Sequence, residues 1–163
     1  MKYTVRTAKY ADLPRIEEIY SYARQFMADT GNPNQWGSTH PPVETLKDDI
    51  EKQLLYVLEN ETGIHGVFYF YIGEDPTYGY VEGGSWRSDS PYGTIHRIAG
   101  DGSGGVLDAA VSFIKKMISH IRIDTHHDNT VMQRAVVKQG FSKRGIIYLE
   151  NGDPRIAYDL WEE

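Results

Sequence analysis

The chain has 163 residues, of which 40% are apolar and 25% are charged, a composition that fits one globular domain over residues 1–163 with a sizeable core. It contains no cysteine, which excludes a disulfide framework, a zinc–thiolate site and a cysteine nucleophile. The net charge of −6 comes without a basic cluster, the N-terminus is too polar for a signal peptide and no apolar run could span a bilayer. We therefore expect a cytoplasmic protein that binds neither nucleic acid nor membrane.

The first half of the sequence predicts a strand, two helices and a hairpin. Residues 3–7 alternate between apolar and polar types, as in a strand. Residues 13–28 carry one apolar stripe, which favours a helix that packs on a sheet, and a shorter helix is expected over 43–53. Two apolar, aromatic-rich runs at 54–59 and 64–72 flank a turn and predict a hairpin.

A loop over residues 29–42 separates the two helices and contains Trp36. A large aromatic side chain on a long loop favours a wall or lid of a binding site, here on the substrate side. The alternative is that Trp36 only anchors the loop to the core. After the hairpin, an extended piece over 80–82 carries Tyr80, a second candidate for substrate contact, and Glu82.

The sequence is organised around residues 94–107, where a strand, a glycine loop and a helix follow one another. Residues 95–98 alternate as in a strand, and an apolar helix face begins at Val106. Without Cβ atoms, the loop can turn its backbone N–H groups toward one point, next to the partial positive charge of the helix N-terminus. This layout predicts a diphosphate site, and the alternative is a flexible loop. The glycines are Gly100, Gly102, Gly104 and Gly105.

The last third of the sequence predicts a strand over 121–125, a helix over 130–139 and a hairpin of two strands over 142–150 and 155–161. Strands and helices thus alternate in the second half, after a strand, two helices and a hairpin in the first. The fold class is therefore α/β, a sandwich with a mixed sheet.

His126, His127 and Asp128 follow one another between the predicted strand and helix, and all three are residue types that hold metal ions. Adjacent histidines on one turn usually point apart, and no second cluster of such residues joins them in the sequence. We therefore expect no metal site.

The order of elements and the glycine loop resemble the GNAT family of N-acetyltransferases, and a second motif supports the resemblance. Asn129 matches the Asn that opens the family's last helix. Lys138, Gly140 and Phe141 match the Lys-x-Gly-Phe that closes it. The resemblance covers nearly the whole chain. It implies a mixed, mostly antiparallel central sheet that is flanked by helices and splayed between its two central parallel strands.

The resemblance also implies acetyl-CoA as the cosubstrate, and no metal. In the family, the cofactor lies in the V-shaped opening between the two parallel strands. On this sequence, residues 96–99 would hold the pantetheine and residues 100–106 the diphosphate. The amide of Asn129 would hold the pantetheine arm, or cap its helix, or both. The implied cofactor-binding residues are Ile98, Ala99, Gly100, Gly102, Ser103, Gly104, Gly105, Val106 and Asn129.

Two positions depart from the family's pattern. Ala99 stands where the family has Arg or Gln ahead of its loop, and the loop itself is short. Val136 stands where the family often has a Tyr that serves as general acid, and a valine side chain has no proton to give. The general acid is therefore unassigned.

Acetyl transfer to an amine needs a base for the amine and a donor that polarises the thioester carbonyl. A backbone N–H near Ile98 or Ala99 would serve as the donor. His96 lies two residues before Ile98, so we expect both on one face of the strand beside the thioester, and the ordinary pKa of histidine, about 6.5, suits a base. The alternative is a buried structural histidine. Glu82 is the second candidate base.

We therefore expect an acetyltransferase that moves the acetyl group of acetyl-CoA to a primary amine of a small molecule or peptide. The alternative is a non-catalytic module of the same fold that binds acyl-CoA for sensing or interaction. The missing Tyr favours the module, whereas His96 and the motif that begins at Asn129 favour the enzyme. No motif identifies the acceptor, and a homodimer is one assembly that the sequence leaves open.

Overall fold

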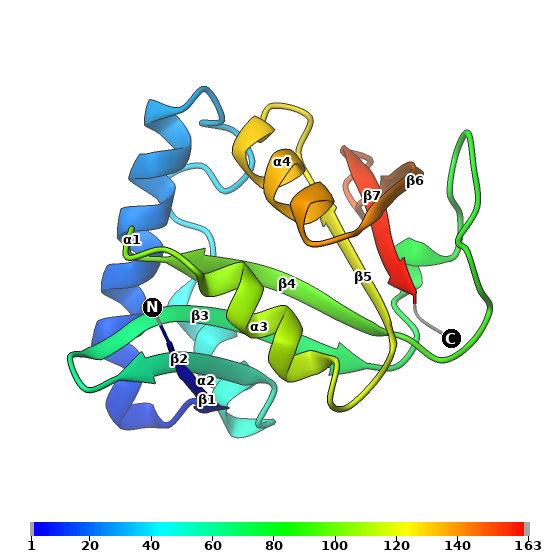
Figure 1. Cartoon of the computed structure of the whole chain (residues 1–163). Helices are drawn as coiled ribbons and strands as arrows, with labels where there is room; N and C mark the ends of the chain where they lie inside the picture. Colours follow the sequence, from blue (N-terminus) through cyan, green and yellow to red (C-terminus); the bar gives the residue numbers. More distant parts are fainter. Residues whose placement is uncertain (1, 162–163) are drawn as a thin grey trace.

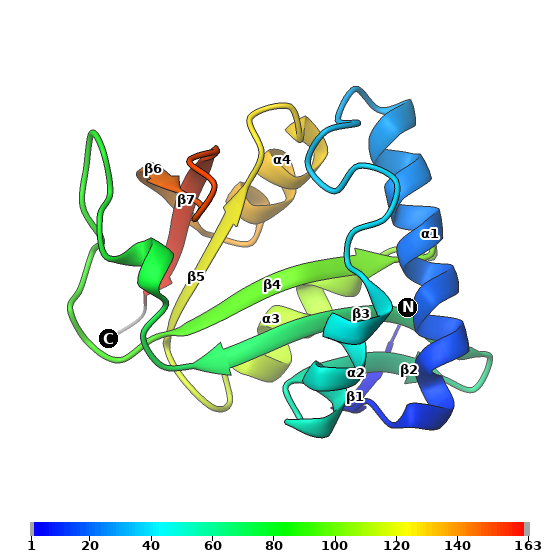
Figure 2. The same cartoon turned by 180° about the vertical axis from the view of Figure 1, so that it is seen from behind.

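The computed structural model describes residues 2–161, and over these residues one sheet carries helices on both faces (Figure 1 and Figure 2). The strands are β1 (Thr4–Thr7), β2 (Leu55–Asn60), β3 (Gly63–Ile72), β4 (Gly93–Gly100), β5 (His120–Thr125), β6 (Ser142–Tyr148) and β7 (Pro154–Trp161). The helices are α1 (Leu13–Asp29), α2 (Val43–Glu51), α3 (Val106–Ile114) and α4 (Thr130–Lys138), with short 3₁₀ helices η1 (Tyr10–Asp12) and η2 (Pro76–Tyr78). None of the helices in the described part of the chain is both long and apolar enough to cross a bilayer.

The sheet has the strand order β1-β2-β3-β4-β5-β7-β6, and its neighbours are antiparallel except for β4 and β5. These two parallel strands pair only at Gly93 with Ile121 and at Thr94 with Arg122, and then they separate (Figure 1). The predicted fold class, a mostly antiparallel sheet that is splayed between two central parallel strands, is therefore confirmed.

Two hydrophobic clusters hold the helices on opposite faces of the sheet. On one face, Ala110, Val111 and Ile114 of α3 and Val136 of α4 pack on β3, β4 and β5. On the other face, α1 and α2 pack on β2, β3 and β4, as Figure 2 shows from that side. The apolar stripes read from the sequence of the helices therefore face the sheet, and burial of these side chains is the main term that stabilises the layers.

One detail differs from the sequence-based expectation and concerns residues 80–82. Helix α3 ends at Ile114, and Ile118 packs on the core beyond it. The backbone there changes to tighter i→i+3 bonds, from Lys116 to Phe113 and from Met117 to Ile114, which ends the helix. The extended piece over 80–82 makes a single β-bridge and not a full strand.

Candidate active site

A cavity of about 520 Å³ lies where β4 and β5 separate. Its walls come from these two strands, from the loop between α1 and α2, from the start of α4 and from the turn between β6 and β7. This volume is typical of a small-molecule site. Of the residues that the sequence singles out, His96, Ile98, Trp36 and Asn129 line the cavity.

A bulge in β4 shapes one wall of the cavity. On β3 the pairing advances by two residues, whereas on β4 it advances by three, from His96 to Ala99. The extra residue is accommodated at Arg97, whose φ of 52° lies in the left-handed region. The hydroxyl of Tyr20 donates a hydrogen bond of 2.7 Å to the carbonyl of Arg97, which ties the bulge to α1.

The bulge changes which side chains share a face of β4. Ile95 and Ile98 both join the core under α3 and α4. The ring of His96 lies on the opposite face, 5.8 Å from the ring of Tyr69, which packs against the α1–α2 side of the sheet. The expectation that His96 and Ile98 share a face is therefore wrong, because strict alternation fails at the bulge.

The imidazole of His96 lies between two carboxylates. Its Nε2 is 2.8 Å from Oδ2 of Asp75, which precedes η2, and its Nδ1 is 3.9 Å from Oδ1 of Asp124 on β5. In the tautomer that donates Nε2–H to Asp75, the lone pair of Nδ1 faces Asp124 and the cavity that Asp124 lines. This tautomer places a proton acceptor at the wall of the cavity.

The buried side chain of Tyr78 orients the carboxylate of Asp124. Its hydroxyl donates a hydrogen bond of 2.6 Å to Oδ1 of Asp124, and its ring packs on Trp86 at 5.1 Å between centroids. Burial, together with the charge of Asp124, raises the pKa of Tyr78 well above its ordinary value. Tyr78 therefore stays protonated at neutral pH, and its hydroxyl proton forms the hydrogen bond that orients Asp124.

The carboxyl group of Asp75 makes a testable contribution to acid stability. Burial acts to raise the pKa of Asp75, but hydrogen bonds from His96 and Thr77 outweigh it and lower the pKa to about 2. This value is below the 3.8 of an unperturbed Asp. The stability that the carboxylate contributes is therefore complete above about pH 4 and is lost as the pH falls from about 4 to about 2.

Asp75→Asn should therefore flatten the dependence of the free energy of unfolding on pH between about 4 and about 2. Urea titrations at several pH values in this range measure the slope. Asp89→Asn, at an exposed position, is the matched control and should keep the wild-type slope. A wild-type slope in Asp75→Asn as well would contradict the assignment.

The glycine loop lies between β4 and α3, where the sequence predicts it. Gly102, Gly104 and Gly105 have φ values of 91°, 90° and 76°, in the region that favours glycine. The first backbone bond of α3 runs from the N–H of Ala109 to Gly105, so the N–H groups of residues 106–108 have no helical partner. Among the described residues, the N–H groups of Gly104 and Gly105 also donate to none.

Asp101 places a negative charge in this loop, which the pattern of glycines does not indicate. Its Oδ2 accepts a hydrogen bond of 2.6 Å from Arg15 and lies 2.7 Å from Nδ1 of His65. Its Oδ1 accepts a hydrogen bond of 3.0 Å from the N–H of Ser103. The charge of Arg15 offsets that of Asp101, which reduces the repulsion of an anion at the loop.

The loop between α1 and α2 is fixed over the cavity at two points. Oδ1 of Asn129 caps α4 by accepting from the N–H of Met132 at 3.0 Å, and its Nδ2 donates to Gln35 of the loop at 3.0 Å. The capping role expected for Asn129 is therefore confirmed. Trp36 packs edge-on against Tyr20 at 5.6 Å and also lines the cavity, so it anchors the loop and forms a wall.

Tyr80 and Glu82 lie outside the cavity. Glu82 forms its bridge with Ile146 of the edge strand β6, and its carboxylate accepts a hydrogen bond of 2.9 Å from Tyr148. Tyr80 is 64% exposed. The structure therefore corrects the expectation that they belong to the site, because the open edge of β6 and not the central strand pairs with this segment.

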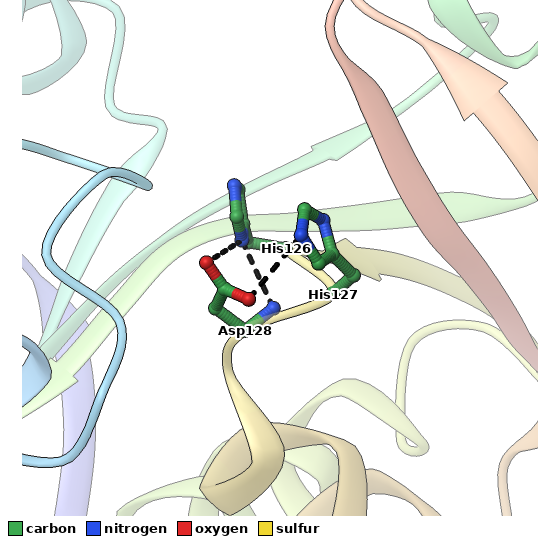
Figure 3. Close-up of side chains that lie close together, drawn as sticks. All are labelled: His126, His127 and Asp128. Carbon is green, nitrogen blue, oxygen red and sulfur yellow. Dashed lines mark hydrogen bonds and ion pairs between the residues drawn. The ribbon is translucent and has the colours of Figure 1, made fainter.

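His126, His127 and Asp128 lie close together, which also differs from the expectation for adjacent histidines (Figure 3). The two rings stack at 4.3 Å between centroids instead of pointing apart. Nδ1 of His126 accepts a hydrogen bond of 3.0 Å from the N–H of Asp128, so this nitrogen is engaged within the turn. No further His, Asp or Glu of the described residues joins the group, which leaves three consecutive residues with few free ligand atoms.

No protein-family model and no curated protein matches the sequence, whereas many solved structures do. A GNAT-family acetyltransferase from Streptococcus agalactiae is 25% identical with a TM-score of 0.88, over 99% of this chain and 96% of that one. A GNAT-family acetyltransferase from Listeria monocytogenes is 20% identical with a TM-score of 0.66, over 96% and 93%. A ribosomal-protein-alanine N-acetyltransferase from Brucella melitensis is 15% identical with a TM-score of 0.63, over 98% and 99%. Its splayed sheet and this full-length likeness show that the chain has the fold of the GNAT family of acetyltransferases.

Proposed function

We propose that the protein is an N-acetyltransferase that moves the acetyl group of acetyl-CoA to a primary amine of a small molecule or peptide. The observation that carries the proposal is the position of His96. Its Nε2 is hydrogen-bonded to Asp75 at 2.8 Å, and its Nδ1 faces Asp124 in the opening between β4 and β5. A histidine that is oriented by one carboxylate and has its other nitrogen at a cavity is the arrangement of a general base.

Acetyl-CoA supplies the acyl group as a thioester. Backbone N–H groups of residues 100–106 would hold its diphosphate, and the β4 backbone at 96–99 would hold its pantetheine. The bulge at Arg97 supports this placement, because an extra residue frees backbone groups from the sheet ladder. The space beside Gly104 also supports it, because, its chain neighbours apart, no atom of the described residues lies within 4 Å of the position that a Cβ would take.

The acceptor amine is activated between Asp124 and His96. An ammonium nitrogen can lie within hydrogen-bond distance of both Oδ1 of Asp124 and Nδ1 of His96, since these atoms are 3.9 Å apart. Nδ1 takes one proton of the ammonium, and the neutral amine forms a bond to the thioester carbon. As the carbon–sulfur bond breaks, the nitrogen gives up its second proton to water, which leaves a neutral amide. Asp75 stabilises the resulting imidazolium through Nε2, and Tyr78 keeps Asp124 in place.

The thiolate leaves without a tyrosine acid. No tyrosine lines the cavity in the described part of the chain, and Val136 is fully buried in the core under α3 and α4. We infer that the thiolate takes its proton from water. The same observation favours the second candidate function, a module that binds acyl-CoA without transfer, and the two differ in one measurable product.

Isothermal titration with acetyl-CoA, followed by an assay for free thiol across a panel of primary amines, separates the two functions. Binding together with amine-dependent release of thiol supports the transferase. Binding without thiol release for any amine supports the non-catalytic module. Absence of binding would contradict both.

Trp36→Phe should raise the KM of the acceptor roughly fivefold, which corresponds to about 1 kcal/mol of lost apolar contact. The reason is that Trp36 lines the cavity from the α1–α2 loop, on the face of the sheet that carries His96. Steady-state kinetics with the acceptor varied at saturating acetyl-CoA measures the effect. An unchanged KM in the folded variant would leave Trp36 with its anchoring role only.

A further inference from the structure

Arg155, near the start of β7, is a buried charge without a carboxylate partner among residues 2–161. It is 7% exposed and lines the cavity. Its one hydrogen bond to another described residue runs from Nη1 to the carbonyl of Pro154 at 2.9 Å. Asp153 lies in the same wall, but its Oδ2 accepts from Asn151 and its carboxylate lies beyond ion-pair distance of the guanidinium.

A mostly buried guanidinium at the wall of a cavity, without a carboxylate partner among the described residues, can pair with a bound anion. Buried arginines are normally paired, because the loss of hydration costs several kcal/mol per ion. Nε and Nη2 of Arg155 donate to no described residue, and together they form the side of the guanidinium that binds a carboxylate through two parallel bonds. The cavity that this group lines is therefore suited to an anion.

The other cationic groups in the lining do not compete for such an anion. Arg97 is ion-paired with Asp49. The pKa of His40 is lowered by burial and by the charges of Arg97, Arg24 and Arg155, so this histidine is neutral at neutral pH. Arg155 is thus the one unpaired cation among the described lining residues. A single guanidinium suits a singly charged carboxylate better than a phosphate dianion, which usually takes more than one cation.

Asp124 and His96 line the same cavity, and in the proposed reaction they bind and deprotonate the amine of the acceptor. We propose that the acceptor is an amino acid, a molecule whose primary amine is accompanied by a free carboxylate, and that Arg155 binds that carboxylate. The proposal rests on the proposed acetyltransferase function, which places the amine of the acceptor at Asp124 and His96. It makes Arg155 a determinant of specificity, which separates free amino acids from the N-terminal amines of proteins, whose carboxyl ends lie far away.

The test compares proteinogenic L-amino acids with their carboxamides as acceptors. The wild-type protein should prefer the free acids by at least roughly tenfold in kcat/KM, the scale of a hydrogen-bonded charge. Arg155→Met should lose this preference and keep the rate with carboxamides. Arg155→Lys should keep part of it, because the charge remains and the paired donors do not. Arg134→Met, at an exposed position on α4, is the matched control and should behave as wild type.

Titration calorimetry of the same free acids with the CoA-bound protein gives a readout that does not depend on catalysis. Binding that is lost in Arg155→Met but not in Arg134→Met supports the proposal, even if no acetyl transfer is found. Transfer to amines with equal rates for free acids and carboxamides would overturn the proposal and leave the acetyltransferase function standing. If no free acid binds and none is acetylated, the proposal is overturned as well.

Discussion

Replacing His96 with alanine should lower kcat/KM for the acceptor amine by on the order of a hundredfold or more, the usual scale of general-base catalysis. The loss should appear mainly in kcat, because Nδ1 of His96 takes the amine proton during the reaction. Affinity for acetyl-CoA should stay within a few fold, since the cofactor contacts are expected from backbone groups of β4 and the glycine loop. Initial rates and titration calorimetry measure the two effects separately.

The pH profile gives the same variant a second readout. An imidazole accepts a proton only in its neutral form, so catalysis by a histidine base gives kcat/KM of the wild-type protein a limb that rises with pH. This rising limb should be absent in His96→Ala. His127→Ala is the matched control, because His127 is 64% exposed and lies outside the cavity. A near-normal rate and an unchanged profile in folded His96→Ala would remove His96 from the mechanism.

A second variant distinguishes a catalytic role of His96 from a role in packing. Its ring lies 5.8 Å from that of Tyr69 and 6.1 Å from that of Tyr78, so alanine would also remove packing. His96→Gln keeps a side chain of similar size whose amide can donate to Asp75. A folded His96→Gln protein with the hundredfold loss supports the base, whereas full activity in this variant would assign the ring to packing alone.

The strands and helices of the sheet layers were predictable because they depend on local periodicity, whereas the opening between β4 and β5 was implied only by the resemblance to the GNAT family. Apolar residues at alternating positions mark β4 and β5, and a helix stripe between them requires a crossover, which makes the pair parallel. The sequence does not show that residues 80–82 form a single β-bridge instead of a strand. Its pairing at Glu82 depends on the open edge of β6, which lies more than sixty residues later in the sequence.

The geometry of the candidate base was only partly predictable. Strict alternation places His96 and Ile98 on one face, and nothing local signals that Arg97 adopts a positive φ. That conformation is held from distant elements, by the hydrogen bond from Tyr20 and by the ion pair with Asp49. A bulge that long-range contacts stabilise is beyond a reading of periodicity.

The other residues of the candidate site differ in how far their positions could be predicted from the sequence. Asp124 is a polar residue near the carboxyl end of a strand parallel to β4, and such positions line the opening of a splayed sheet, so it could have been found. Asp75 lies in an irregular segment, and only the folded chain brings it to Nε2 of His96. Arg155 reads as an ordinary residue of an edge hairpin, and its missing partner is visible only in three dimensions.

Gly104→Val should lower the affinity for acetyl-CoA by roughly a hundredfold or more. Gly104 has a φ of 90°, which a β-branched residue rarely adopts, and its N–H donates to no described residue. A valine there would turn this N–H away and place methyl groups where the diphosphate is expected. The loss of this hydrogen bond to a charged group, about 1.5 kcal/mol or more, together with that of a neighbouring N–H group that the methyl groups would block, gives a change of this size.

The control for this prediction is Gly31→Val. Gly31 has a φ of 91°, and, its chain neighbours apart, no described atom lies within 4 Å of the position of its missing Cβ, so the substitution imposes the same backbone strain outside the glycine loop. If strain alone weakens the protein, both variants should lose thermal stability by a similar amount and bind acetyl-CoA alike. If the loop holds the diphosphate, only Gly104→Val should lose affinity in titration calorimetry. Undiminished affinity in folded Gly104→Val would place the diphosphate elsewhere on the chain.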